Sequence, residues 1–179
     1  MLKALFSLYW RLCLFREGPE NMPQHPLWIG CLMFLLIMLD ALALFFFDKK
    51  ASFFGYFFGR ALLIFLYALQ VSCMLRFKGE QQRFSKTFSA LMGKEVLFTF
   101  FIFIALLASD FFNMRPNSLG GAFFSLLFLL LYSWDVFIEG FIFQRALNVR
   151  LLLGLSLAIS LLIMNQWIEL KVIMPLYIN

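Results

Sequence analysis

Asp135 and Glu139 are the side chains in this sequence with the clearest potential for chemistry, because they lie four residues apart within a long apolar segment. On a helix, this spacing places both carboxylates on one face. Such a pair could relay protons, bind a cation or receive an arginine. A simpler alternative is that Glu139 lies at a membrane interface while Asp135 caps or pairs with a polar group of another segment, such as Gln70 or Ser72.

Two further acidic residues, Asp40 and Asp110, lie within other apolar segments. Ionisable groups are costly at membrane depth, and a function is the default explanation for their presence there. Asp40 and Asp110 therefore join Asp135 and Glu139 as candidates for an intramembrane polar site.

Other catalytic and metal-binding patterns are not found in the sequence. His25 is the single histidine, so a histidine metal site or a Ser-His-Asp triad would depend on one residue that is better explained as part of an interfacial loop. The three cysteines are widely spaced and form no CxxC pattern: Cys13, Cys31 and Cys73. No cluster of polar residues at one membrane depth is apparent. We therefore expect no catalysis, no cofactor and no bound metal.

The composition identifies the environment in which these residues must be held. Hydrophobic residues make up 63% of the 179 residues and charged residues 14%, and the mean hydropathy is +0.89. Soluble domains are about half apolar and a quarter charged, so this chain has too few polar residues to cover a water-facing surface. Its net charge of +5 includes no basic run and is typical of membrane topology and attraction to anionic lipid. No nucleic-acid partner is expected.

Five apolar runs approach the roughly 20 residues that a helix needs to cross a bilayer. They cover residues 27–47, 53–75, 96–112, 121–143 and 151–168. A membrane barrel would alternate polar and apolar residues, whereas residues 126–131 are continuously apolar. The sequence predicts an all-α fold, in which residues 23–179 form one polytopic transmembrane bundle of about five helices.

Residues 1–22 are predicted to form an amphipathic helix and a loop before the bundle. Lys3, Ser7 and Arg11 form a narrow polar stripe on a helix, and the remaining face is apolar and includes Trp10. This pattern is typical of a helix at the membrane interface, with Lys3, Trp10 and Arg11 in contact with the interface. Packing of the helix against the protein's own spans is an equally weighted and compatible alternative.

A second amphipathic stretch precedes the third apolar run. Phe84, Phe88, Leu91 and Met92 share one helical face. We expect a short interfacial helix that rests on the bilayer before the third span begins. The alternative is a docking site for a cytoplasmic partner.

The basic residues predict the orientation, because cytoplasmic loops are enriched in lysine and arginine. With the N-terminus inside, ten of the fifteen basic residues are cytoplasmic: Lys3, Arg11, Arg16, Arg76, Lys78, Arg83, Lys86, Lys94, Arg145 and Arg150. The pair Lys49 and Lys50 opposes this assignment. We expect a cytoplasmic N-terminus, a C-terminus on the opposite side and a bacterial inner membrane as the location.

Small residues four positions apart mark two candidate helix-packing faces. Gly55 and Gly59 form one pair, and Gly154 and Ala158 form the other. Helices associate closely in lipid at such small-xxx-small positions. We expect these faces to support assembly, either with copies of the chain or with other membrane proteins.

The layout of the chain resembles that of the Yip (Ypt-interacting protein) family of five-span membrane proteins. The resemblance is carried by the segment Arg16–Glu20, Pro26, Trp134, Arg145–Leu147 and Gly154. It implies a non-enzymatic protein that organises membrane or other membrane proteins, with its N-terminus in the cytoplasm. The long hydrophilic N-terminal region through which eukaryotic members are implicated in binding small GTPases is missing here, so no small GTPase partner is expected.

Two functions follow from this sequence. The first is a structural or accessory subunit of a membrane complex, whose partners are the bilayer and either a membrane protein or further copies of the chain. The alternative is a small proton- or cation-coupled transporter or channel that uses Asp135 and Glu139. Membrane-bound catalysis is disfavoured by the residue inventory.

Overall fold

The protein is built from helices throughout the part of the chain that the computed structural model describes, residues 2–47, 53–111 and 119–173. The α-helices are α1 (Leu2–Cys13), α2 (Pro26–Phe47), α3 (Phe53–Phe77), α4 (Phe84–Phe111), α5 (Leu119–Leu147) and α6 (Leu151–Ile168). Short 3₁₀ turns, η1 (Pro19–Asn21) and η2 (Gln81–Arg83), precede α2 and α4, and a π-helical turn, η3 (Glu169–Ile173), follows α6. The predicted all-α fold is confirmed.

Five of these helices, α2 to α6, are long and apolar enough to cross a membrane. Their outer faces carry large exposed apolar side chains, such as Phe45, Phe65 and Leu129. Lipid can cover such side chains, whereas water would make their exposure costly. The chain is an integral membrane protein with five candidate spans, as the sequence predicts.

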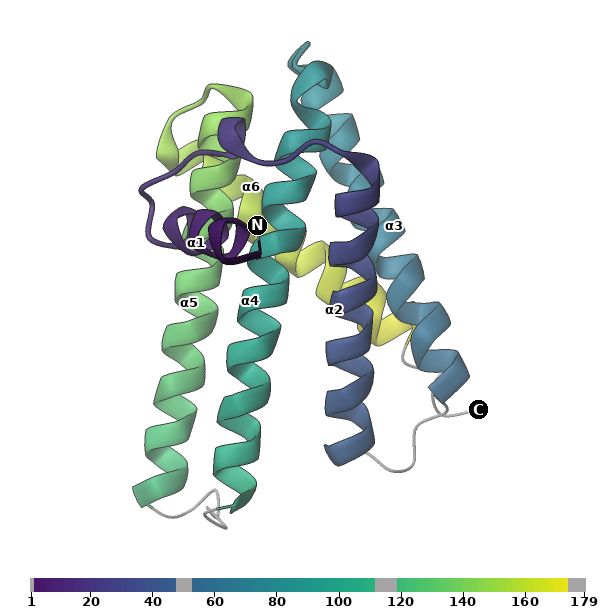
Figure 1. Cartoon of the computed structure of the whole chain (residues 1–179), viewed down its shortest axis with the longest axis vertical. Helices are drawn as coiled ribbons and strands as arrows, with labels where there is room; N and C mark the ends of the chain where they lie inside the picture. The colour runs from purple at the N-terminus through teal and green to yellow at the C-terminus, as the bar shows by residue number, and fades with distance from the viewer. Residues whose placement is uncertain (1, 48–52, 112–118, 174–179) are drawn as a thin grey trace.

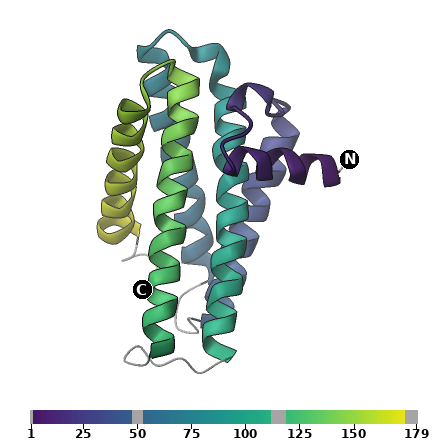
Figure 2. The ribbon, with the colours of Figure 1, turned by 90° about the vertical axis from the view of Figure 1, so that its left-hand side faces the viewer.

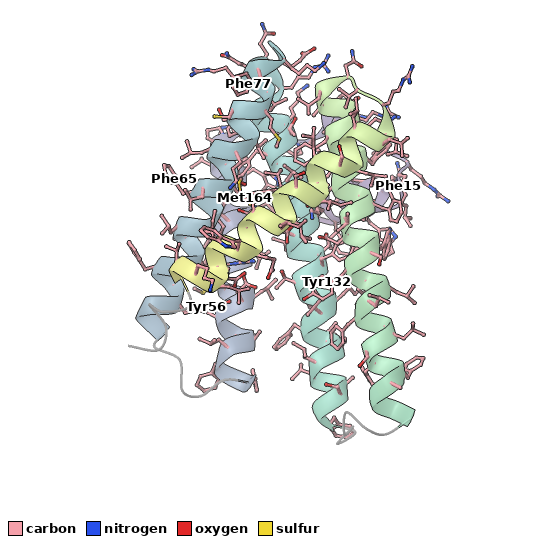
Figure 3. The ribbon with its side chains drawn as sticks, turned by 180° about the vertical axis from the view of Figure 1, so that it is seen from behind. Phe15, Tyr56, Phe65, Phe77, Tyr132 and Met164 are labelled. Atoms are coloured by element: carbon pink, nitrogen blue, oxygen red, sulfur yellow. The ribbon has the colours of Figure 1, made fainter. Side chains whose placement is uncertain are left out.

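The five long helices form two pairs and a crossing helix. Figure 1 shows α4 and α5 side by side on one flank and α2 and α3 on the other. Seen from behind, α6 runs diagonally from the end of α5 toward α3 (Figure 3). Apolar side chains from all five helices meet in one buried core, including Leu36, Ile64, Leu91, Ile142 and Leu161.

Helix α1 lies across α4 and α5, outside the five-helix bundle (Figures 1 and 2). The Tyr9 hydroxyl is hydrogen-bonded to Ser89 Oγ of α4 at 2.8 Å and accepts a hydrogen bond from Trp28 Nε1 of α2 at 2.8 Å. The Trp10 ring packs against Phe101 and Trp134. Helix α1 therefore packs on the protein's own spans.

The third membrane helix begins twelve residues earlier than predicted. The sequence predicted a separate short helix around Phe84, but the structure continues α4 without a break from Phe84 to Phe111. Residues 87–94 are all buried, and η1, α1, α2 and α5 all pack against α4. The first turns of α4 are thus covered by protein instead of resting on the bilayer.

Helices α5 and α6 meet at small residues. Gly154 of α6 lies so close to the backbone carbonyl of Gly140 that a side chain at residue 154 would overlap it. Ala158, one turn further along α6, is completely buried. The second predicted pair lies in α3, where Gly59 is buried and Gly55 is half-buried. The Gly154 face therefore joins two helices of the same chain.

Candidate intramembrane ionic site

Lys94 is the centre of the candidate site. Its side chain is 0% exposed, and its Nζ atom donates hydrogen bonds to Asp135 Oδ1 at 2.8 Å and Oδ2 at 2.9 Å. The same ammonium group lies 3.2 Å from Glu139 Oε2 and 2.8 Å from Glu95 Oε1. A buried charge is tolerated only when it is paired and hydrogen-bonded, and here one ammonium group is held by three carboxylates.

Three helices position this cluster. Lys94 and Glu95 are adjacent in α4, while Asp135 and Glu139 are one helical turn apart in α5. Helix α3 adds Tyr67, whose hydroxyl donates a 2.6 Å hydrogen bond to Glu139 Oε1. Glu139 is 6% exposed, so both of its oxygens are held inside the protein.

A second ion pair joins α2 to α3. Arg60 Nε donates a 2.6 Å hydrogen bond to Asp40 Oδ2. Both side chains are mostly covered by protein, the arginine less so than the aspartate. Each charge compensates the other at a depth where an unpaired charge would be costly.

The two charged groups face a common cavity of about 410 Å³. Its lining combines apolar side chains with polar residues of α2 to α6 and of η3, and the polar ones are Asp40, Tyr56, Arg60, Tyr67, Glu95, Thr99, Tyr132, Asp135, Glu139, Asn165, Gln166 and Glu169. On α4 its lining extends from Met92 to Leu106, which is about 21 Å along a helix that rises 1.5 Å per residue. Figure 3 shows Tyr56 near the lower end of α6 and Tyr132 on the opposite flank of the bundle. The cavity is a long space between the membrane helices, with both polar and apolar side chains in its walls.

Helix α1 covers the Lys94 end of the site. The Tyr9 ring lies against Gly93 so closely that a side chain at residue 93 would overlap it. Cys13, the last residue of α1, is 1% exposed. Burial raises the pKa of its thiol to about 12, with Lys94 lowering it and Asp135 raising it by smaller amounts. Docking of α1 therefore removes this end of the cluster from water.

The carboxylates of Glu95, Asp135 and Glu139 have the geometry of a cation site. Their nearest oxygen atoms lie within 4.8 Å of one another. Hard cations prefer oxygen ligands such as carboxylates, and a carboxylate can also take up a proton. Because Lys94 Nζ bonds to all three groups, an incoming cation would have to compete with the lysine for them. Because three carboxylates face one ammonium group, the cluster has more negative than positive charge, and this excess favours binding of an additional cation.

The sequence-predicted acidic residues have different locations in the structure. Asp135 and Glu139 share one face of α5 and bind the same lysine. The predicted partners Gln70 and Ser72 are not the partners of Asp135: the Gln70 amide donates to Asn165 Oδ1 at 3.2 Å instead. Asp40 lines the same cavity through its pair with Arg60. Asp110 lies in the last turn of α4, and its side chain is outside the described residues.

The predicted interfacial residues Lys3 and Arg11 are exposed, while Trp10 is half-buried in the contact with α4 and α5. Arg11 lies 4.0 Å from Glu17 of the following loop.

Sequence reasoning missed Lys94, Glu95, Arg60 and Tyr67. Lys94 and Glu95 were interpreted as the polar flank of a span beginning at residue 96, and the expectation that no polar cluster exists at one depth is wrong. The available signal was the amphipathic stretch beginning at Phe84, which runs into the next apolar segment without a proline. Interpreted as one helix, it places Lys94 in a helix interior.

Comparisons of the chain with protein-family models, with curated proteins and with solved structures found no match. The class is therefore defined by the fold and the site: an integral membrane protein of five candidate spans with a charged cavity between them. The resemblance to the Yip family stays a prediction.

Proposed function

We propose that this protein binds protons or a small cation at the Lys94 cluster and moves them through the membrane. The observation that carries the proposal is a fully buried lysine that faces three carboxylates, and these carboxylates line a cavity between the membrane helices. Structural ion pairs usually match one cation with one anion, whereas this cluster contains more acidic than basic groups.

The charge balance supports uptake of positive charge. Negative groups that are buried without full compensation are costly in a low-dielectric environment, so a proton or a cation at Glu95, Asp135 or Glu139 would stabilise the site. Asp40 and Arg60 form a pair with no net charge, so the pair does not cancel the excess of negative charge at the lysine cluster.

The cavity supports a path for the bound charge. On α4 the lining continues past Glu95 through Thr99 to the apolar residues Ile102, Phe103 and Leu106, so the cavity extends along the helix away from Lys94. Polar groups at this depth need water or protein partners. A carboxylate of the cluster can bind a proton or cation in place of the Lys94 ammonium group. When the ammonium group binds the carboxylate again, the ion is released into the cavity. In this cycle Asp135 and Glu139 bind the ion, and Lys94 is the internal counter-charge.

The proposal includes the orientation and location predicted from the sequence, a cytoplasmic N-terminus in a bacterial inner membrane. The basic segments between α3 and α4 and between α5 and α6 support it, because they lie at the same end of the bundle (Figure 1) and positive charge favours the cytoplasmic side. An accessory-subunit function stays a prediction for which the apolar outer faces of the helices offer a surface.

Reconstitution into proteoliposomes tests the proposed function. A pH-sensitive dye inside the vesicles reports proton flux, and an indicator selective for the added cation reports cation flux, each driven by an imposed gradient. We expect flux in the wild type and its loss in the Asp135→Asn/Glu139→Gln double variant. Glu17→Gln, which changes an acidic residue outside the cavity, is the matched control. Equal flux in all three proteins, or no flux in the wild type, would refute the proposed function.

A further inference from the structure

A second pocket lies at the opposite end of α4 from Phe111, outside the charged cavity. It has a volume of about 100 Å³ and is lined by residues of η1, η2, α4 and α5: Pro19, Glu20, Arg83, Lys86, Thr87, Arg145 and Ala146. The segments that connect α3 to α4 and α5 to α6 both lie at this end of the bundle (Figure 2). Three of its lining side chains are basic and one is acidic.

The two arginines of this pocket are held in place by the protein. Arg83 Nη1 donates to the backbone carbonyl oxygens of Arg145 at 3.4 Å and Ala146 at 3.3 Å, and Arg83 Nε lies 3.1 Å from Glu80. The Arg145 guanidinium lies 5.3 Å from the centre of the Phe141 ring. Guanidinium groups that are already oriented lose less entropy when they bind an anion.

The acidic residue of the pocket is weakly engaged. Glu20 Oε1 lies 3.6 Å from Arg145 Nη1, and both side chains are about half exposed. An exposed ion pair of this kind contributes little to stability, so an anionic ligand can replace Glu20 at Arg145. Lys86 has no ionic partner within the described ranges.

Thr87 provides an independent indication of a ligand. It is 1% exposed, and its hydroxyl oxygen has no hydrogen-bond partner among the residues that the structure describes. Buried hydroxyl groups are nearly always hydrogen-bonded. Thr87 is also in the first turn of α4, where the helix dipole favours negative charge.

We infer that this pocket binds a phosphate group, either as the headgroup of an anionic lipid or as free phosphate. Its ligands are Arg145, Lys86 and Arg83, with the Thr87 hydroxyl as a further hydrogen-bonding group. Ligand pockets for whole small molecules measure roughly 300–1,000 Å³, so this smaller pocket admits a charged head and leaves any attached chain outside. Guanidinium groups match the geometry of phosphate oxygens.

Binding by the purified full-length chain in neutral detergent tests this inference, with dioleoylphosphatidylglycerol and inorganic phosphate as separate probes. Native mass spectrometry measures lipid binding, and calorimetry measures phosphate binding. We expect Arg145→Gln and Lys86→Gln to weaken binding by about tenfold or more, since each removes a charge-assisted hydrogen bond. Glu20→Gln removes the competing carboxylate and should tighten binding.

Arg150→Gln is the matched control, because it removes the same charge from an exposed residue at the same end of the bundle but outside the pocket. Lipid binding that depends on Arg145 more than on Arg150, without phosphate binding, identifies a lipid headgroup as the ligand. Phosphate binding with the same dependence identifies free phosphate. Equal weakening by Arg145→Gln and Arg150→Gln, or no binding of either probe, would overturn the inference.

Discussion

Replacing Lys94 with methionine should strongly destabilise the fold. Methionine keeps the length and apolar stem of the side chain and removes the ammonium group that binds Glu95, Asp135 and Glu139. Removing one partner of a buried ion pair costs about 3–5 kcal/mol, because the remaining charge is left uncompensated. For a chain of this size each kcal/mol lowers the melting temperature by about 2–4 °C, so we expect a decrease on the order of 10 °C.

Thermal unfolding of the purified chain in detergent, followed by tryptophan fluorescence, measures this decrease. Lys78→Met is the matched control, because Lys78 is exposed and surface substitutions usually change stability by less than about 0.5 kcal/mol. The Lys94→Met/Asp135→Asn double variant completes the comparison. Its loss should be smaller than the sum of the two single losses by about 0.5–3 kcal/mol, since the two side chains contact each other.

Two results would refute this reasoning. One is a Lys94→Met protein that unfolds at the same temperature as Lys78→Met, which would mean that the buried ammonium group is not needed to compensate the carboxylates. The other is strict additivity of the two substitutions, which would mean that Lys94 and Asp135 do not interact.

Two further predictions concern the helix contacts around the site. Gly154→Leu should lower the stability of the single chain by about 1–3 kcal/mol or more, since the new side chain overlaps the α5 backbone. Gly30→Leu is the control, because the space around a Cβ at residue 30 is open. Equal melting temperatures of the two variants would contradict the packing of α6 on α5. The pKa of the Cys13 thiol is raised to about 12, so this thiol should remain protonated from pH 7 to 10. In a variant with the other two cysteines replaced by serine, we therefore expect slow reaction with N-ethylmaleimide over this pH range. Gly93→Leu should displace α1 and speed that reaction, whereas fast labelling of the unsubstituted protein at pH 8 would show that α1 is not docked.

The membrane helices could be predicted from the sequence because lipid requires long, continuous apolar segments. Helix α6, for example, begins and ends at the residues that the sequence predicted for the last span, 151 and 168, although the candidate span itself continues to Val172. The start of α4 does not follow from hydropathy, although the amphipathic stretch from Phe84 runs into the next apolar segment without a proline. Residues 87–94 are buried by other parts of the protein, and hydropathy alone does not distinguish protein contact from lipid contact.

The acidic half of the site was visible in the sequence and its basic half was not. Asp135 and Glu139 are conspicuous because they lie within an apolar segment, and their shared face follows from their spacing. Lys94 lies 41 residues from Asp135, and its partners depend on how α4 packs on α5. The pair of Asp40 with Arg60 likewise depends on the packing of α2 on α3, which local sequence does not specify.

The central claim is that the carboxylates of the Lys94 cluster take up protons or a cation. Infrared difference spectroscopy of the purified chain, recorded between two pH values and with or without added cation, tests this claim most directly because it detects the carboxyl groups themselves. We expect the difference spectra of the wild type and of Glu17→Gln to contain carboxyl bands. These bands should be missing from the difference spectrum of Asp135→Asn/Glu139→Gln. Identical difference spectra for all three proteins would contradict it.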